Sequence, residues 1–100
     1  MNHNKFIKSL KSSSPPNGLG GVELALWYAV KGDWDMAHNT AQKIHTETAS
    51  WIHAYLHREE GDIENAHYWY HCARKEAYSE SLKAELEDII KFVLLDDFNE

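Results

Sequence analysis

The sequence predicts an all-α domain, and three observations carry that prediction. Glycine–aspartate pairs at Gly32-Asp33 and Gly61-Asp62 end one predicted helix and cap the next. Apolar residues recur with helical spacing over most of residues 22–93. No useful length of chain alternates apolar and polar residues as a half-buried strand does. We therefore expect two antiparallel helix pairs followed by a C-terminal amphipathic capping helix.

The stretch SSSPPNGLGG, residues 12–21, divides the chain. Pro15 and Pro16 prevent a helix from running through it. Residues 1–21 are predicted to form an N-terminal tail or short helix and a Ser/Pro/Gly linker, and we favour a frayed leading helix. Residues 22–100 are predicted to form a single helical-repeat domain, because 43% apolar residues in a chain of 100 suffice for one core but not two.

Turn and cap signals divide the repeat domain into five helices. Their expected ranges are Val22–Lys31, Trp34–His45, Ala49–Glu60, Ile63–Tyr78 and a last helix that begins near Ser79 or Ser81. The fourth should bury an inner stripe of Ile63, Ala66, Tyr70, Ala73 and Ala77. The last should bury Leu82, Leu86, Ile89, Ile90 and Val93, with Glu85, Glu87 and Asp88 on the opposite face.

The two glycine–aspartate blocks form an internal repeat. When Gly32 is aligned with Gly61, Ala37 meets Ala66 and Ala25 meets Ala54. The second block, with Gly61, Asp62, Ala66, Tyr70 and Ala73, resembles a tetratricopeptide repeat: a glycine–aspartate turn, a small residue where helices cross, and an aromatic residue one turn later. The resemblance covers about residues 22–74 and implies paired antiparallel helices. The glycines are closer together than the family repeat of about 34 residues, and its usual closing proline is absent after both blocks.

A longer pattern resembles a group of small bacterial proteins. Its elements read GDWxxAH, here Gly32 to His38, and WxHAYLHRxEGDxxNAxYWY, here Trp51 to Tyr70. The second element is long and specific. This resemblance implies the fold and the surroundings of these residues, but it implies no chemistry.

Charge and cysteine content restrict the partners. Residues 1–20 carry three lysines and no acidic residue, whereas the remaining residues are strongly acidic, and the net charge is −6. An acidic surface disfavours nucleic acid and anionic membranes.

No segment reaches the roughly 20 apolar residues of a membrane helix, and no apolar run follows the N-terminal lysines as in a secretory signal. Cys72 is the single cysteine, which fits a reducing compartment, and we expect a cytoplasmic protein.

Seven histidines are the unusual feature of the composition. His53 and His57 are four residues apart, as are His67 and His71, so each pair lies on one helical face and has the spacing by which a helix offers two imidazoles to a metal. A helical wheel places His67 and His71 roughly 90° or more from the apolar stripe, so we expect them to face solvent. Paired cysteines and an HExxH motif are both absent.

For His53 and His57 the helical wheel and the repeat register disagree. The wheel places them opposite the apolar face, whereas the register aligns them with Leu24 and Tyr28, where helices of a pair pack together. We follow the register, because a middle helix of a stack is covered on several sides. Buried imidazoles need hydrogen-bond partners, for which we name Glu60, His38 and Tyr68. Satisfied core histidines that join helices are the simpler interpretation, and a polar pocket rimmed by Trp51, Arg58 and Trp69 is the alternative.

Two further expectations concern surfaces. Tyr68 and Trp69 cannot enter the same core as Tyr70, because successive helical residues point about 100° apart, and we expect them to pack against the last helix. The first helix has an apolar face that a short N-terminal helix or a second copy of the chain would cover, and we favour a homodimer. That face consists of Val22, Leu26, Ala29 and Val30.

These patterns predict a non-enzymatic module that binds a peptide or protein partner through its first and third helices. The expected binding residues are His38, Trp51, His53, Tyr55, His57, Arg58, Glu60 and Trp69. We predict no catalytic residue, no metal and no cofactor for this function. The alternative is a histidine site of His38, His53, His57 and Glu60 that binds a metal or small molecule and supports acid–base chemistry.

Overall fold

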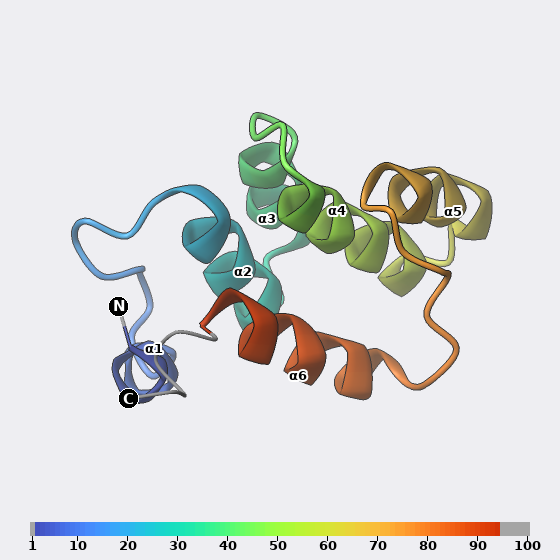
Figure 1. Cartoon of the computed structure of the whole chain (residues 1–100). Coiled ribbons are helices and arrows are strands. Elements are labelled where there is room, and N and C mark those ends of the chain that lie inside the picture. Colours follow the sequence, from blue (N-terminus) through green and yellow to red (C-terminus); the bar gives the residue numbers. More distant parts are fainter. Residues whose placement is uncertain (1, 95–100) are drawn as a thin grey trace.

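The computed structural model describes residues 2–94, which form six α-helices and no strand (Figure 1). The helices are α1 (His3–Ser9), α2 (Gly21–Lys31), α3 (Trp34–Ala41), α4 (Glu47–Glu59), α5 (Ile63–Cys72) and α6 (Leu82–Val93). The predicted all-α class is confirmed for this part of the chain. The predicted starts of α2, α3, α5 and α6 agree with the structure to within a residue or so.

The two glycine–aspartate hinges have the same geometry. Gly32 and Gly61 take left-handed φ angles of 82° and 86°. The N–H of the aspartate that follows each glycine donates 2.9 Å to a carbonyl in the last turn of the preceding helix, which is the Schellman closure. The carboxylates of Asp33 and Asp62 then each accept the N–H three residues later at 3.2 Å, capping the next helix. The same two residue types therefore build the same turn in both blocks.

The predicted ends of α3 and α5 are wrong. α3 ends at Ala41 rather than His45, and α4 begins earlier than expected, because Thr46 takes an extended conformation and its hydroxyl accepts the N–H of Ala49 at 3.1 Å. The chain therefore leaves the helix between Ala41 and Thr46. Thr48 and Ser50 lie inside α4.

α5 ends at Cys72 rather than Tyr78 because a third Schellman closure follows it. The N–H of Lys75 donates 3.0 Å to the carbonyl of Tyr70, and Arg74 takes the left-handed position with φ 58°. Ala77, expected in the inner stripe, is consequently exposed and outside any helix. Ile63, at the start of the same stripe, is 50% exposed.

α4 is the central helix of the fold. It packs against α2, α3, α5 and α6, and Figure 1 shows it between α3 and α5, with α6 below it. Every residue from Trp51 to His57 is buried, which explains why the helical wheel of a one-sided amphipathic helix failed here. Small residues form part of the core, since Ala25, Ala37, Ala54 and Ala66 are essentially inaccessible.

α1 is packed rather than frayed. Phe6 is fully buried, the indole Nε1 of Trp27 donates 3.0 Å to the Ser9 hydroxyl, and the Lys31 ammonium donates 2.7 Å to the carbonyl of Leu10. The expected apolar face of α2 is partly covered in this way within one chain, with Leu26 buried. The homodimer that we favoured from the sequence is therefore not needed to cover this face.

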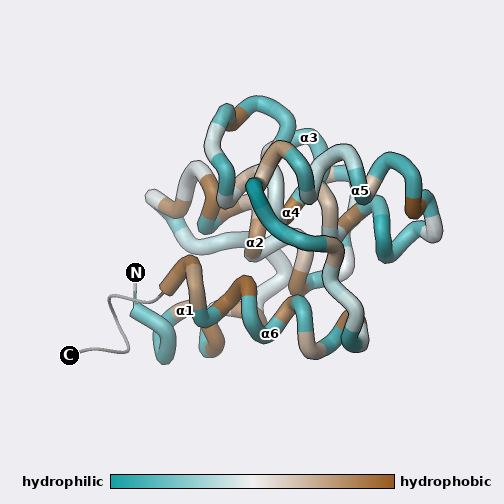
Figure 2. Tube along the Cα trace, turned by 45° about the vertical axis from the view of Figure 1, so that its right-hand side comes forward, coloured by the Kyte–Doolittle hydropathy of each residue, from teal (hydrophilic) through white to brown (hydrophobic). Residues whose placement is uncertain are grey.

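α6 closes the fold as an amphipathic helix with Ser81 as its cap. Figure 2 shows hydrophobic positions recurring along it between hydrophilic ones. One assignment was wrong: Glu85, expected on the polar face, is completely buried. It lies three residues after Leu82 and four before Ile89, so helical spacing places it on the apolar face despite its charge.

Candidate functional site: a histidine cluster between α3 and α4

Three imidazoles meet where α3 crosses α4. His38 comes from α3, and His53 and His57 lie one turn apart on α4. A ring nitrogen from each lies within 4.8 Å of the corresponding nitrogens of the other two. His53 and His57 are 3% and 6% exposed, and His38 is partly exposed. The cluster is therefore at the edge of the core, with His38 on its outer side.

Two short hydrogen bonds fix the rings. His53 Nε2 and His38 Nε2 are 2.8 Å apart, so one of them donates and the other accepts. His57 Nδ1 is 2.8 Å from Oε1 of Glu60, the residue that caps α4. The bond to the carboxylate assigns the proton to His57 Nδ1 and leaves its Nε2 with a lone pair.

Indole rings hold the cluster from both sides. Trp34 stacks on His38 with ring centroids 4.8 Å apart and planes 10° apart, and Trp69 stacks on His53 at 3.8 Å and 8°. The Trp34 indole Nε1 also donates 2.7 Å to the carbonyl of Leu56, which fixes that ring against α4. Both tryptophans are placed by the hinges: Trp34 opens α3 after the first, and Trp69 lies on α5 after the second.

Burial favours the neutral form of His53 and His38. Desolvation, together with the neighbouring His38 and His57, lowers the pKa of His53 from 6.5 to about 4. Desolvation and His57 also lower the pKa of His38. At neutral pH His38 and His53 are therefore uncharged, and the neutral imidazole is the form that binds metals.

A second polar cluster lies on another face of α4 and serves the fold. The buried carboxylate of Glu85 on α6 accepts from Trp51 Nε1 at 3.0 Å, Arg58 Nη1 at 3.0 Å and the Tyr70 hydroxyl at 2.5 Å. A second Arg58 nitrogen donates to the carbonyl of Glu80. The carboxylate is thus fully satisfied and ties α4, α5 and α6 together.

The expected binding residues consequently divide into separate groups. His38, His53, His57, Glu60 and Trp69 come together in the histidine cluster, whereas Trp51 and Arg58 belong to the Glu85 network. Tyr55 is buried in the core, which raises its pKa to about 12. The single pocket rimmed by Trp51, Arg58 and Trp69 that the sequence suggested is therefore not formed.

The predicted partners of the buried histidines are only partly confirmed. Glu60 and His38 are hydrogen-bond partners, as expected, but Tyr68 is 59% exposed and does not contact them. Tyr68 and Trp69 do not pack against α6 as predicted, because Trp69 stacks on His53 instead. His67 and His71 are exposed, in agreement with the helical wheel.

Sequence reasoning missed two important residues. Trp34 was recognised as part of the hinge but not as the ring that stacks on His38, although the two are four residues apart on one face of α3. Glu85 was assigned to solvent from its charge alone. In both cases, spacing on the helix was the available signal.

No protein-family model, curated protein or solved structure matches the chain. Between residues 2 and 94, none of the helices is both long and apolar enough to span a bilayer.

Proposed function

We propose that this protein binds a divalent transition-metal ion through His38, His53 and His57. The observation that carries the proposal is the convergence of three imidazole nitrogens, from two helices, within 4.8 Å of one another. Imidazole suits zinc, copper, iron and nickel. Three histidines are a recurrent ligand set for a zinc ion that keeps its fourth position open for water or substrate.

The distances support this assignment. With Zn–N bonds of about 2.0–2.1 Å, tetrahedral geometry separates two ligand nitrogens by about 3.3 Å. His38 Nε2 and His53 Nε2 are 2.8 Å apart, so this pair must separate by about half an ångström, and the third nitrogen, within 4.8 Å of the others, must move inward by up to about 1.5 Å. His38 is the partly exposed member of the cluster.

The surroundings also support a metal. Histidine ligands usually donate their second ring nitrogen to a carboxylate or carbonyl, which orients the ring and raises its basicity. The Glu60 carboxylate, 2.8 Å from His57 Nδ1, has this relation to His57. A cation at the centre of the cluster would accept one lone pair from each imidazole; in the structure, His57 Nε2 lies 3.4 Å from the Asn65 amide nitrogen.

Titration of the stripped protein tests the proposal. After chelator treatment, Zn²⁺ and Co²⁺ would be added and binding followed by calorimetry, visible absorption of Co²⁺ and thermal melts. We expect one ion per chain. At a free-ion concentration 100 times the dissociation constant, the stabilisation is about 2.7 kcal/mol, which raises Tm by about 10 °C or more.

Matched histidine variants separate this site from non-specific binding. His38→Ala should abolish the response, because His38 is the one ligand from α3. Glu60→Gln should weaken affinity by about 10- to 100-fold. The double variant His67→Ala/His71→Ala removes an exposed pair with the same spacing and should bind normally. Binding that disappears only with His67 and His71, or no stoichiometric binding, would reject the proposal.

We also propose that α2–α3 and α4–α5 are tetratricopeptide-like pairs with α6 as the cap. The support is the shared geometry of the Gly32 and Gly61 hinges and the small residues in the core. Such pairs commonly form binding surfaces. A peptide- or protein-binding role is therefore a second candidate function.

The observation that favours this second function is apolar exposure on α5. Ile63 and Tyr68 are 50% and 59% exposed, and aromatic residues such as tyrosine are enriched at protein interfaces. A pull-down that compares the wild type with Ile63→Ala/Tyr68→Ala tests it, since loss of a recovered partner is expected. Trp51 and Arg58 are unsuitable for this test because both hold Glu85 in the fold.

A further inference from the structure

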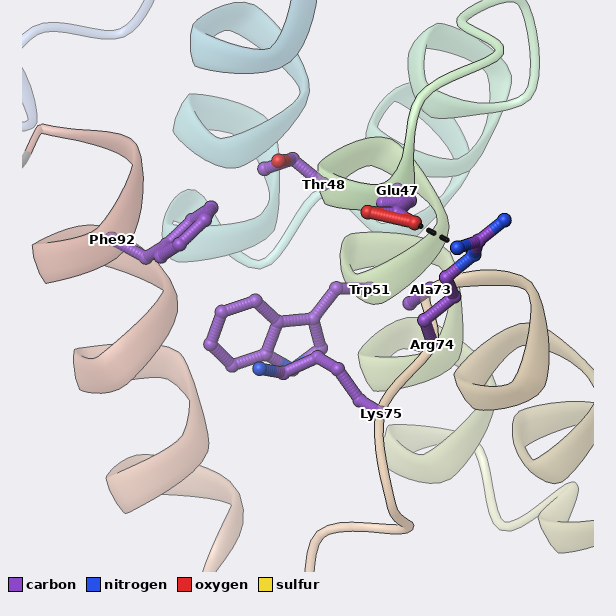
Figure 3. A pocket seen from close by; sticks show the side chains of 7 residues that line it. All are labelled: Glu47, Thr48, Trp51, Ala73, Arg74, Lys75 and Phe92. Atoms are coloured by element: carbon purple, nitrogen blue, oxygen red, sulfur yellow. Dashed lines mark ion pairs between the residues drawn. The ribbon is translucent and has the colours of Figure 1, made fainter.

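A cavity that uses none of the histidines lies between α4, α6 and the segment after α5 (Figure 3). Its volume is about 190 Å³. Its lining consists of Glu47, Thr48, Trp51, Ala73, Arg74, Lys75 and Phe92. The Trp51 indole and the Phe92 ring meet edge to face at 5.8 Å, and Phe92 is 53% exposed. The cavity therefore has an aromatic wall in which Phe92 is open to solvent and Trp51 is buried.

The rim of this cavity is cationic in an otherwise acidic protein. The Lys75 ammonium lies 4.1 Å from the centre of the Trp51 ring, and it pairs with no carboxylate among residues 2–94. Figure 3 shows the lysine side chain beside the indole. Arg74 Nε pairs with Glu47 at 3.1 Å, and both side chains are largely exposed. Two cations thus face one anion at this rim, whereas the chain as a whole carries a net charge of −6.

The backbone of Arg74, at this rim, has a left-handed conformation that costs stability. Arg74 takes φ 58°, and it occupies the position after α5 that Gly32 and Gly61 occupy after α2 and α4. Glycine takes this conformation without the steric cost that arginine incurs. Strained residues often lie at ligand-binding sites, and here the strained residue contributes one of the two cations.

We propose that this cavity binds small aromatic carboxylates. The ring would lie against Trp51 and Phe92, and the carboxylate would pair with Lys75 and Arg74. The volume admits one ring with a short acidic side chain, because larger ligands occupy pockets of about 300 Å³ and more. The same chemistry occurs in a free aromatic acid and in the C-terminal aromatic residue of a peptide. This proposal does not depend on the metal site.

Phenylacetate is the probe, with phenethylamine as its cationic counterpart. Binding would be followed by NMR through the indole N–H signal of Trp51, assigned with a Trp51→Phe variant. For a ligand of this size we expect a dissociation constant on the order of 1–10 mM, with the amine binding at least several times more weakly. Equal binding of the amine, or an unperturbed indole signal at saturating acid, overturns the proposal.

Charge variants test the rim. Lys75→Met should weaken phenylacetate binding about threefold or more, since an exposed ion pair contributes up to roughly a factor of five. Lys83→Met removes an exposed lysine on α6 outside the cavity and should leave binding unchanged. Equal affinity of Lys75→Met and wild type contradicts the assignment.

Arg74→Gly makes the sharpest test because two readouts should move in opposite directions. Relief of the left-handed strain should raise Tm by several degrees, while loss of the cation should weaken phenylacetate binding. A variant that is more stable and binds equally well shows that Arg74 has no binding role and rejects its part in the site.

A peptide that ends in phenylalanine identifies the source of the carboxylate. If it binds more tightly than phenylacetate, the natural ligand is a peptide terminus; if it binds more weakly, the ligand is a free acid. If the same peptide with an amidated C-terminus binds equally well, the proposal is overturned.

Discussion

The depressed pKa of His53 makes the stability of this protein depend on pH. An unfolded chain takes up a proton on this histidine near pH 6.5, whereas the folded chain resists protonation down to about pH 4. The unfolded state therefore binds more protons in this window, and stability falls as the pH is lowered. The contribution is complete above about pH 6.5 and is lost progressively as the pH falls to about 4.

The size of the effect follows from the two pKa values. Between pH 7.5 and 5.5, linkage gives a loss of about 1.3 kcal/mol, rising to about 3 kcal/mol at pH 4. His53 is only 3% exposed, so solvent does little to screen it. For a domain of this size, 1.3 kcal/mol lowers Tm by about 5–10 °C. His38, whose pKa is also lowered, adds to the loss in the same direction.

Urea unfolding at pH 7.5 and 5.5 measures this loss directly. The comparison uses His53→Gln, which keeps a polar group beside His38 but does not titrate, and His67→Gln, which removes an exposed histidine of α5. The pH-dependent loss should shrink by about 1.3 kcal/mol in His53→Gln and should persist in His67→Gln. If wild type and His53→Gln lose the same stability, the imidazole is not buried in its neutral form and the reasoning fails.

Two further substitutions test the rest of the fold. Glu85→Ala leaves Arg58, Trp51 and Tyr70 without their shared acceptor, and it should lower the free energy of unfolding, measured in urea, by about 3–5 kcal/mol. Glu85→Gln should lower it clearly less. If Glu85→Ala leaves the free energy of unfolding unchanged, water replaces the carboxylate. Gly61→Ala forces alanine into φ 86° and should cost about 1 kcal/mol, whereas Gly20→Ala, outside the positive-φ region and with open space around it, should have a much smaller effect on Tm.

The hinges were predictable because glycine and aspartate act locally. Gly32 and Gly61 take the left-handed conformation, and the aspartates that follow cap the next helices, with no help from distant residues. The end of α5 was not predictable by the same rule. Its closure has Arg74 where the rule expects glycine, so the pattern carried no stop signal.

The histidine site was predictable only in part. Aligning the two blocks placed His53 and His57 in the core, because equivalent positions of a repeat have equivalent neighbours. The partners of Trp34 and Trp69 depend on how helices cross, and no local pattern fixes a crossing. Glu85 was missed because charged residues are rarely fully buried; its burial depends on three donors brought together from α4 and α5.

The short N-terminal helix also changes where the protein can be cut. Composition marks the proline–glycine stretch as the natural border, yet Phe6 and Ser9 on one side of it complete the packing of Trp27 on the other. A fragment starting at Gly21 would open a hole the size of a phenyl ring and leave an indole N–H without its acceptor. Cutting the chain at that border would thus separate residues that pack together, and a purification tag is better placed ahead of α1 than in place of it.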